Sequence, residues 1–263
     1  MFNKKILTIK ASLISKLTGY NQYCSRDEAL SELVSTNLWL KQHLGAVDKH
    51  FQTSTEKRLS SLTSEELKEI ALSIGQNPCC VNPKLVASGL VKALTSCVRA
   101  ESDCVSRDSL LNFLDRHSPI KKRLADCLER DVRIERGCYT ESSCLDRLEQ
   151  SINMPIVKRN STLYKKSIFD LEGVEVVIVG KIDGISSNGK TLVETKQRRN
   201  CFFECIPVYE KVQLECYLWL TGIEQAIHVQ NYNGEQKHML YKSDPVLWSQ
   251  IQSRLEAFVK SLM

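Results

Sequence analysis

The sequence contains no apolar run that approaches the length of about 20 residues needed to cross a bilayer as a helix. It also contains no C-x-x-C pair, although it has 11 cysteines, and the adjacent Cys79 and Cys80 suit neither a zinc knuckle nor an ordinary disulfide. It lacks internal repeats and low-complexity linkers. The odd, scattered cysteines favour free thiols in a reducing compartment, the nucleus or the cytoplasm.

The first 23 residues contain lysines but neither arginine nor an acidic residue. A mitochondrial presequence is one interpretation of such a basic segment without acids, but the missing arginine argues against it. The apolar segment is also too interrupted for a secretory signal. The other interpretation is structural. Ile6–Ile9 then forms a strand and Ser12–Leu17 a short helix of the domain itself.

The chain of 263 residues is long enough for one large domain, or for a core with a helical extension. Hydrophobic residues make up 42%, which allows a sizeable core. The net charge of +5 permits an acidic partner such as DNA but does not require one.

Helix-capping signals dominate residues 1–130, so we expect a mainly helical N-terminal region packed on a core at 131–263. Ser25 to Glu28 and Thr63 to Glu66 resemble capping boxes, and Asn82-Pro83 places proline at a first helical position. Two further helices are expected at Asp108–Leu114 and from Ser118-Pro119 through Leu128. Their apolar stripes are most simply core-facing surfaces.

The chain is organised around one stretch, Val176 to Lys196. Val176–Val179 is a β-branched run typical of a buried strand, and Asp183 follows at the strand end. Asn188-Gly189 favours a tight turn, and Thr191–Lys196 is expected to return alongside the first strand. This hairpin is expected to bring Asp183 next to Glu194, so that two carboxylates and the ammonium of Lys196 converge.

On the return strand, Glu194 and Lys196 are two residues apart and therefore share a face, while Val193 and Thr195 point to the other. Asp183 and Glu194 repel each other unless a cation lies between them. Mg²⁺ commonly binds one or two carboxylates together with water and substrate phosphate, so the pattern suits metal-assisted phosphodiester hydrolysis. The alternative is a surface hairpin whose charges are merely solvated.

Charged residues flank this hairpin on both sides. Arg136-Gly137 interrupts a helical pattern that resumes at Glu141, which is either a solvated helix charge or a further acid of the site. Ile156–Val157 and Ser167–Leu171 are expected to form a strand pair. The neighbouring basic residues are either a solvated rim or phosphate contacts, and they are Lys158, Arg159, Lys165, Lys166, Arg198 and Arg199.

After Pro207, a helix is expected at Val208–Leu220, and Gln213 and Tyr217 share one of its faces because they are four residues apart. Thr221-Gly222 ends that helix. The remaining elements expected are a strand pair, Ala226–Asn231 with Lys237–Tyr241 around Asn233-Gly234, and a last helix, Val246–Leu262, after the cap Asp244-Pro245.

The order of these elements resembles the PD-(D/E)xK nuclease superfamily, and within it the RecB and lambda-exonuclease branch. The wider pattern of short motifs resembles the YqaJ-type viral recombinases. The resemblance is best from Arg136 to the C-terminus and fainter at residues 11–34. The residues that carry it are Ser12 to Tyr23, Ser25-Arg26-Asp27-Glu28, Arg136-Gly137 with Glu141, Gly180-Lys181-Ile182-Asp183-Gly184, Glu194-Thr195-Lys196, Val208 to Gln213, and Tyr217.

The resemblance implies an α/β (α+β) fold with a restriction-endonuclease-like core, in which helices flank a central mixed β-sheet. It implies binding of Mg²⁺ or Mn²⁺ by Asp183 and Glu194, with the carbonyl of Thr195 as a backbone ligand. Glu141 would complete the metal site as the helix acid. Ile182 departs from the family pattern, at a position that varies widely.

The same resemblance implies roles for the other residues. Lys196 would orient the attacking water, and Gln213 and Tyr217 would support the site or touch DNA. Ser25 and Arg26 would form a pocket for a terminal phosphate. The alternative is that Ser25 is only a helix cap and Arg26 a solvated residue of the first turn.

These observations favour a metal-dependent exodeoxyribonuclease that acts on duplex ends in recombination, repair or replication. A structure-specific or single-strand endonuclease on the same core is an alternative, and a non-catalytic DNA-binding module is another. The expected partner is linear duplex DNA, and a homo-oligomer or a recombination partner protein is compatible with the sequence.

Overall fold

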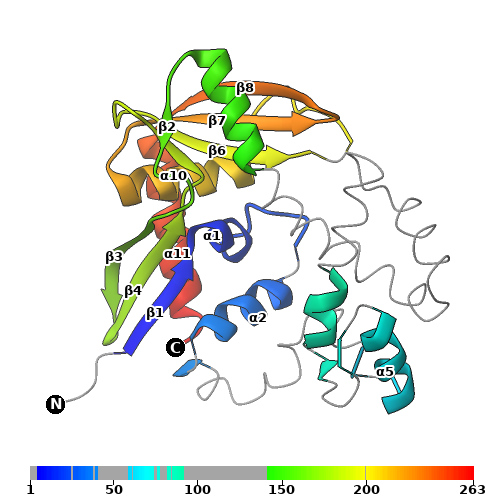
Figure 1. Cartoon of the computed structure of the whole chain (residues 1–263). Coiled ribbons are helices and arrows are strands. Elements are labelled where there is room, and N and C mark those ends of the chain that lie inside the picture. Colours follow the sequence, from blue (N-terminus) through cyan, green and yellow to red (C-terminus); the bar gives the residue numbers. More distant parts are fainter. Residues whose placement is uncertain are drawn as a thin grey trace. The chain divides into compact units, whose positions relative to one another are not determined.

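The computed structural model describes residues 5–24, 26–37, 39–40, 59–60, 62–73, 76–77, 82–83, 85–91, 141–198 and 200–263 (Figure 1). The chain divides into two compact units, one formed by residues 1–51 and 142–263 and the other by residues 52–141. The expected boundary near residue 130 does not coincide with this division, because the N-terminal segment belongs to the same unit as the C-terminal half.

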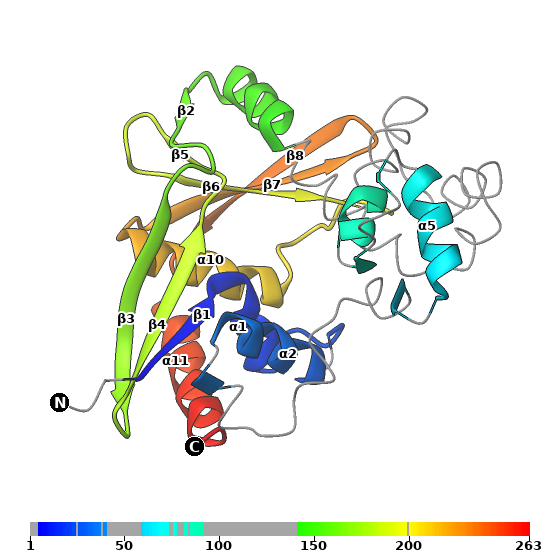
Figure 2. The same ribbon diagram turned by 60° about the horizontal axis from the view of Figure 1, so that its bottom comes forward.

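The first sheet of the larger unit has the strand order β1-β4-β3. In it β1 (Lys5–Lys10) runs parallel to β4 (Val174–Lys181), and β3 (Leu163–Leu171) runs antiparallel to β4 (Figure 2). Leu7 and Ile9 of β1 are wholly buried. This confirms the interpretation of the N-terminus as a strand of the domain, which is followed directly by the short helix α1 (Ala11–Leu17).

The second sheet is mixed and has the order β2-β5-β6-β7-β8. Its central strand β6 (Leu192–Gln197) is antiparallel to β5 (Gly184–Ser186) and parallel to β7 (Gln225–Tyr232). The edge strands are β2 (Ile156–Val157) and β8 (Glu235–Lys242). The expected hairpin around Asn233-Gly234 is confirmed, since both residues have positive φ, 48° and 80°, as a tight hairpin turn requires.

The chain passes from the first sheet to the second between Lys181 and Gly184, and this corrects two expectations. The return strand β6 pairs with the short β5 and not with β4, because β1 and β3 already occupy both edges of β4. The expected central sheet is therefore two sheets. The expected pair of Ile156–Val157 with Ser167–Leu171 is also wrong, since β2 pairs with β5 and β3 pairs with β4.

Helices cover both faces of the second sheet (Figure 1). One face packs on α10 (Val208–Thr221), which ends at Gly222 in the left-handed conformation that suits glycine. The other face packs on the helical residues 141–152 through Leu145 and Leu148. The alternation along β6 places Leu192 in the large core beside α10 and Val193 in the small core beside the other helix. The expected mixed α/β class is confirmed.

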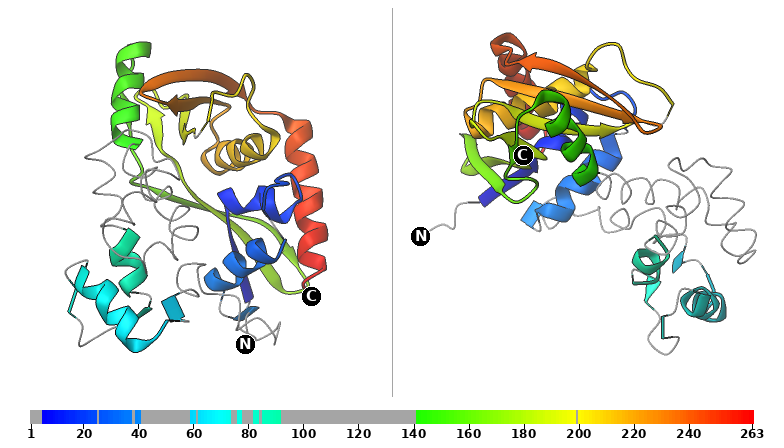
Figure 3. Two further views of the ribbon diagram at one scale, coloured as in Figure 1. Left: turned by 90° about the vertical axis from the view of Figure 1, so that its right-hand side faces the viewer. Right: turned by 45° about the horizontal axis from the view of Figure 1, so that its top comes forward.

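Two further helices complete this unit. The helix α11 (Pro245–Lys260) begins as expected after Asp244, whose carboxylate accepts hydrogen bonds from the backbone N–H groups of Val246 and Leu247. It runs alongside α1, and α2 (Arg26–Thr36) lies against α1 as well (Figure 3).

In the smaller unit, α5 (Ser64–Ser73) begins with the expected capping box. Glu66 accepts a hydrogen bond from the Thr63 backbone N–H at 3.0 Å, and Thr63 Oγ1 accepts one from the Glu66 N–H at 3.3 Å. Residues 85–91 are helical. The helices expected at 108–114 and 118–128 lie outside the described residues. No described helix is long and apolar enough to cross a membrane.

Candidate active site

Asp183 lies in the crossing between the two sheets, and a glycine on either side of it allows the close packing there. A Cβ atom on Gly180 would lie 2.6 Å from Cε1 of Tyr217, and one on Gly184 would collide with Cγ2 of Ile156. No real Cβ atom lies so close to another atom. Glycine therefore lets the backbone lie close to α10 at Gly180 and close to β2 at Gly184, and this close packing fixes the position of Asp183 between them.

The carboxylate of Asp183 is bound to the middle of β6. Its Oδ2 accepts hydrogen bonds from the Thr195 backbone N–H at 2.7 Å and from Thr195 Oγ1 at 2.8 Å, while Oδ1 accepts none from the described residues. Burial raises the pKa of Asp183, and the bonds from Thr195 and the charge of Lys196 oppose that rise. Asp183 therefore contacts β6 at Thr195, the residue next to Glu194.

Glu194, Lys196 and Gln213 form a hydrogen-bonded triangle. Lys196 Nζ lies 2.8 Å from Glu194 Oε1 and 2.9 Å from Gln213 Oε1, and Gln213 Nε2 donates to Glu194 Oε1 at 2.9 Å. Gln213 also donates to the hydroxyl of Tyr217 at 2.8 Å. These contacts confirm two expectations, that Glu194 and Lys196 share a face and that Gln213 and Tyr217 do.

The charges in this cluster perturb one another. Burial by itself lowers the pKa of Lys196, but the charges of Glu194, Glu210 and Asp183 outweigh it, and the pKa is raised. Burial also raises the pKa of Tyr217, and Glu194 adds to that rise. Lys196 is therefore an ammonium surrounded by carboxylates, and Tyr217 is a neutral hydroxyl.

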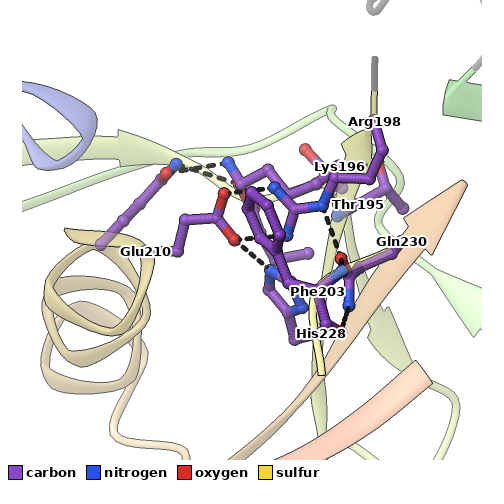
Figure 4. Close-up of polar contacts among 10 residues, drawn as sticks. Thr195, Lys196, Arg198, Phe203, Glu210, His228 and Gln230 are labelled. Carbon is purple, nitrogen blue, oxygen red and sulfur yellow. Dashed lines mark hydrogen bonds and ion pairs between the residues drawn. The ribbon is translucent and has the colours of Figure 1, made fainter. Parts of the chain in front are cut away.

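A second buried polar cluster adjoins this site, and sequence reasoning missed most of it (Figure 4). Arg198 makes two hydrogen bonds to Glu210, at 2.6 and 2.7 Å, and a third to Gln230 at 2.6 Å. His228 Nε2 lies 2.7 Å from Oε2 of Glu210. Burial would raise the pKa of Glu210, but Arg198 and His228 lower it to about 2. The available signal was the alternation of His228 and Gln230 with the apolar Ile227 and Val229 along β7.

The basic residues expected to contact phosphate lie in different settings. Arg159 forms ion pairs with Asp146 and Glu149, and Lys166 lies 4.4 Å from the ring centroid of Trp219. Lys158 and Lys165 are exposed. Ser25, Arg199 and the side chain of Arg26 lie outside the described residues.

The donor atoms suit a hard divalent cation at Asp183 and Glu194. The hydrogen bonds from Thr195 end at one oxygen of Asp183, and those from Lys196 and Gln213 end at one oxygen of Glu194, so each carboxylate keeps its second oxygen out of these bonds. Two carboxylates are a common protein contribution to a Mg²⁺ site.

The third acid expected at this site is Glu141. In the described part of the chain, no group of three or more His, Cys, Asp or Glu side chains is arranged to hold a metal ion. Glu141 begins a helix whose residues Leu145 and Leu148 pack on the Val193 face of the sheet, whereas Glu194 faces α10. The role expected of Glu141 therefore stays a prediction.

Comparison with known proteins gives a distant structural similarity to exonucleases. No protein-family model matches the sequence, and no curated protein matches it significantly. A phage-related exonuclease from Haemophilus somnus matches with 16% identity and a TM-score of 0.37 over 47% of this chain and 67% of that one.

The alkaline exonuclease of Laribacter hongkongensis matches with 15% identity and a TM-score of 0.38, over 64% of this chain and 86% of that one. The same enzyme in complex with dAMP matches with 12% identity and a TM-score of 0.38, over 79% and 90% of the two chains. At these TM-scores the similarity establishes neither a family nor an activity for this chain.

Proposed function

We propose that this protein is a metal-dependent deoxyribonuclease that hydrolyses DNA phosphodiester bonds. The observation that carries the proposal is that β6 holds Glu194 and Lys196 against Gln213 of α10, while its residue Thr195 binds the carboxylate of Asp183 from the crossing between the sheets. An ion pair between the buried Glu194 and the half-buried Lys196 contributes little to stability that apolar side chains would not, so its presence beside a second carboxylate is better explained by chemistry.

Asp183 and Glu194 would hold Mg²⁺ or Mn²⁺, with the carbonyl of Thr195 as a backbone ligand and Glu141 as a further proposed acid. When bound, the metal would polarise the phosphate and make a bound water more acidic. The hydrogen bonds from Thr195 hold Asp183 in place, and those from Gln213 and Lys196 hold Glu194, so the two carboxylates are oriented before any ligand arrives.

Lys196 would contribute positive charge at the reacting phosphate and orient the attacking water. Its ammonium is placed by Glu194 and Gln213, which leaves it a third donor hydrogen for the substrate. Tyr217 would fix the amide of Gln213, because its hydroxyl accepts the second amide hydrogen. Gln213 and Tyr217 thus act as positioning residues in this proposal.

We further propose that the enzyme is an exonuclease acting on the ends of linear duplex DNA, with Ser25 and Arg26 near the terminal phosphate. The pairing of Gln213 with Tyr217 supports this branch of the resemblance. Exposed Lys158 and Lys165, with Lys166 and Arg199, would contact phosphates without reading sequence. Arg159 and Arg198 were expected in the same role, but their ion pairs argue for a structural one.

The test incubates the purified protein with end-labelled linear duplex and with covalently closed plasmid, in Mg²⁺ and in EDTA. Asp183→Asn serves as the inactive control, because contaminating nuclease would persist in it. Mg²⁺-dependent loss of the linear substrate alone supports an exonuclease. Nicking of the plasmid identifies an endonuclease instead, and binding without cleavage in Mg²⁺ identifies a DNA-binding module.

A further inference from the structure

The loop after β6 holds an aromatic side chain in a fixed place beside the site. The backbone N–H of Phe203 donates to Gln230 Oε1 at 2.9 Å, and Gln230 Nε2 donates to the Phe203 carbonyl at 2.9 Å. Gln230 is wholly buried. A buried amide that binds both backbone groups of one loop residue leaves that residue little freedom.

The ring of Phe203 is fixed on one side as well. The guanidinium of Arg198 lies 4.2 Å from the ring centroid, and Glu210 holds that guanidinium with two hydrogen bonds (Figure 4). Phe203 is nevertheless 38% exposed. A buried amide and a buried ion pair therefore hold a phenyl ring in place at the surface. Core packing does not explain this arrangement, because the ring is not in the core.

Phe203 borders a hollow of about 730 Å³ that combines aromatic and basic groups. Phe202, Met239, Lys237 and His238 also line it, and Glu204 is its acidic residue. Lys237 Nζ lies 4.8 Å from the ring centroid of Phe202. Aromatic faces next to lysine are the chemistry by which proteins hold unpaired nucleotides, with bases stacked on rings and phosphates near ammonium groups.

The sheet register places Lys237, which lines this hollow, in the same row of paired residues as Lys196. Lys196 of β6 pairs with Gln230 of β7, and Gln230 pairs with Lys237 of β8. Residues paired across strands point to the same face, and neighbouring strands lie about 4.8 Å apart, so Lys237 is about 10 Å across the sheet from Lys196. That separation is short enough for one strand of DNA to reach both places.

We propose that Phe203 is a stacking platform for an unpaired base of the DNA strand, and that Lys237 contacts a phosphate of the same strand. This inference rests on the proposed nuclease function and adds to it a binding site for single-stranded DNA a few nucleotides from the reacting phosphate. It gives the enzyme a means to hold one separated strand.

The test uses single-stranded oligonucleotides that carry 2-aminopurine, whose fluorescence is quenched when the base stacks. Binding is measured in EDTA and in Ca²⁺, with wild type, Phe203→Ala and Phe203→Trp. Leu240→Ala is the matched control, because Leu240 is 59% exposed on β8 but pairs with Ile227 and so faces away from Lys237. Thermal denaturation of each variant verifies that it is folded.

We expect wild type and Phe203→Trp to quench one defined position of the oligonucleotide. Phe203→Ala should lose that quench and bind about 5- to 150-fold more weakly, which corresponds to the 1–3 kcal/mol per stacked base. Lys237→Gln should keep the quench but lower the slope of log K against log salt by about 1. Leu240→Ala should match wild type.

The outcomes separate this inference from the nuclease proposal. If wild type cleaves DNA and Phe203→Ala retains both quench and affinity, the stacking platform is wrong and the nuclease assignment stands. If wild type shows no quench in either buffer, the platform is also wrong. If wild type binds and quenches but never cleaves, the platform stands on a DNA-binding module.

Discussion

Arg198 and Glu210 join the two elements that carry the candidate site. Arg198 Nη1 lies 2.6 Å from Oε1 of Glu210, and Nη2 lies 2.7 Å from Oε2. Arg198 follows Lys196 by two residues, and Glu210 precedes Gln213 by one turn of α10. This buried ion pair therefore sets the position of the helix that supplies Gln213 relative to the strand that supplies Lys196.

We expect Glu210→Gln to lower the free energy of unfolding by about 3–5 kcal/mol, because it leaves the guanidinium of Arg198 buried without a counter-charge. Urea denaturation at neutral pH measures the change. Glu256→Gln is the control, since Glu256 forms an exposed ion pair with Lys260 and its loss should cost less than about 1 kcal/mol. Similar losses of unfolding free energy in the two variants would show that the buried pair stabilises the protein no more than the exposed one.

Glu210 should also make stability depend on acidic pH. Its pKa is lowered from 4.5 to about 2 in the folded protein, so the folded state holds fewer protons than the unfolded one between these values. The stabilisation is complete above pH 4.5 and is lost as the pH falls toward 2. Urea unfolding of wild type and Glu210→Gln from pH 6 to pH 2.5 measures it. A constant difference between the two proteins over that range would contradict the assignment.

Gly180→Ala should disturb the site through Tyr217. The added methyl would lie 2.6 Å from Cε1 of Tyr217, so the ring must move, at a cost of about 1–3 kcal/mol in stability. The hydrogen bond between Tyr217 and Gln213 then weakens, and DNA cleavage should slow. Thermal denaturation and cleavage rates measure both effects. Adding Tyr217→Ala should recover part of the stability but not the rate, and no recovery would place the clash elsewhere.

Asp183→Asn and Glu194→Gln should each abolish Mg²⁺-dependent cleavage and weaken Mn²⁺ binding measured by calorimetry. Each change removes the charge of a proposed ligand. Without metal, Asp183→Asn should be as stable as wild type or more so, because burial already disfavours the Asp183 charge. Asp170→Asn, an exposed position on β3, is the control. Near-wild-type activity of either site variant would refute the metal assignment.

Lys196→Ala should bind DNA but cleave it at least 100-fold more slowly, since the ammonium is expected to act mainly on transition-state charge. Lys196→Arg should restore little, because a planar fork does not fit the place of an ammonium between Glu194 and Gln213. Equilibrium binding and single-turnover rates separate the two effects. Equal losses of affinity and rate would instead indicate simple phosphate anchoring.

Local signals predicted much of this molecule. The two-residue spacing of Glu194 and Lys196 and the four-residue spacing of Gln213 and Tyr217 placed each pair on one face, and both pairs interact as expected. The Asn233-Gly234 turn and the cap at Asp244 also lie where the sequence predicted. Such features depend on periodicity and on the chemistry of a few neighbouring residues, so the local sequence is sufficient to predict them.

Only the tertiary structure decided which strands pair and which polar groups share the interior. Nothing local distinguishes β4 from β5 as the partner of β6, because that choice depends on β1, more than 160 residues away, occupying an edge of β4. Arg198 was interpreted from the sequence as a solvated charge or a phosphate contact, whereas in the structure it binds Glu210 and Gln230. Strand edges and buried polar atoms must find partners wherever the fold supplies them, and the sequence alone does not identify those partners.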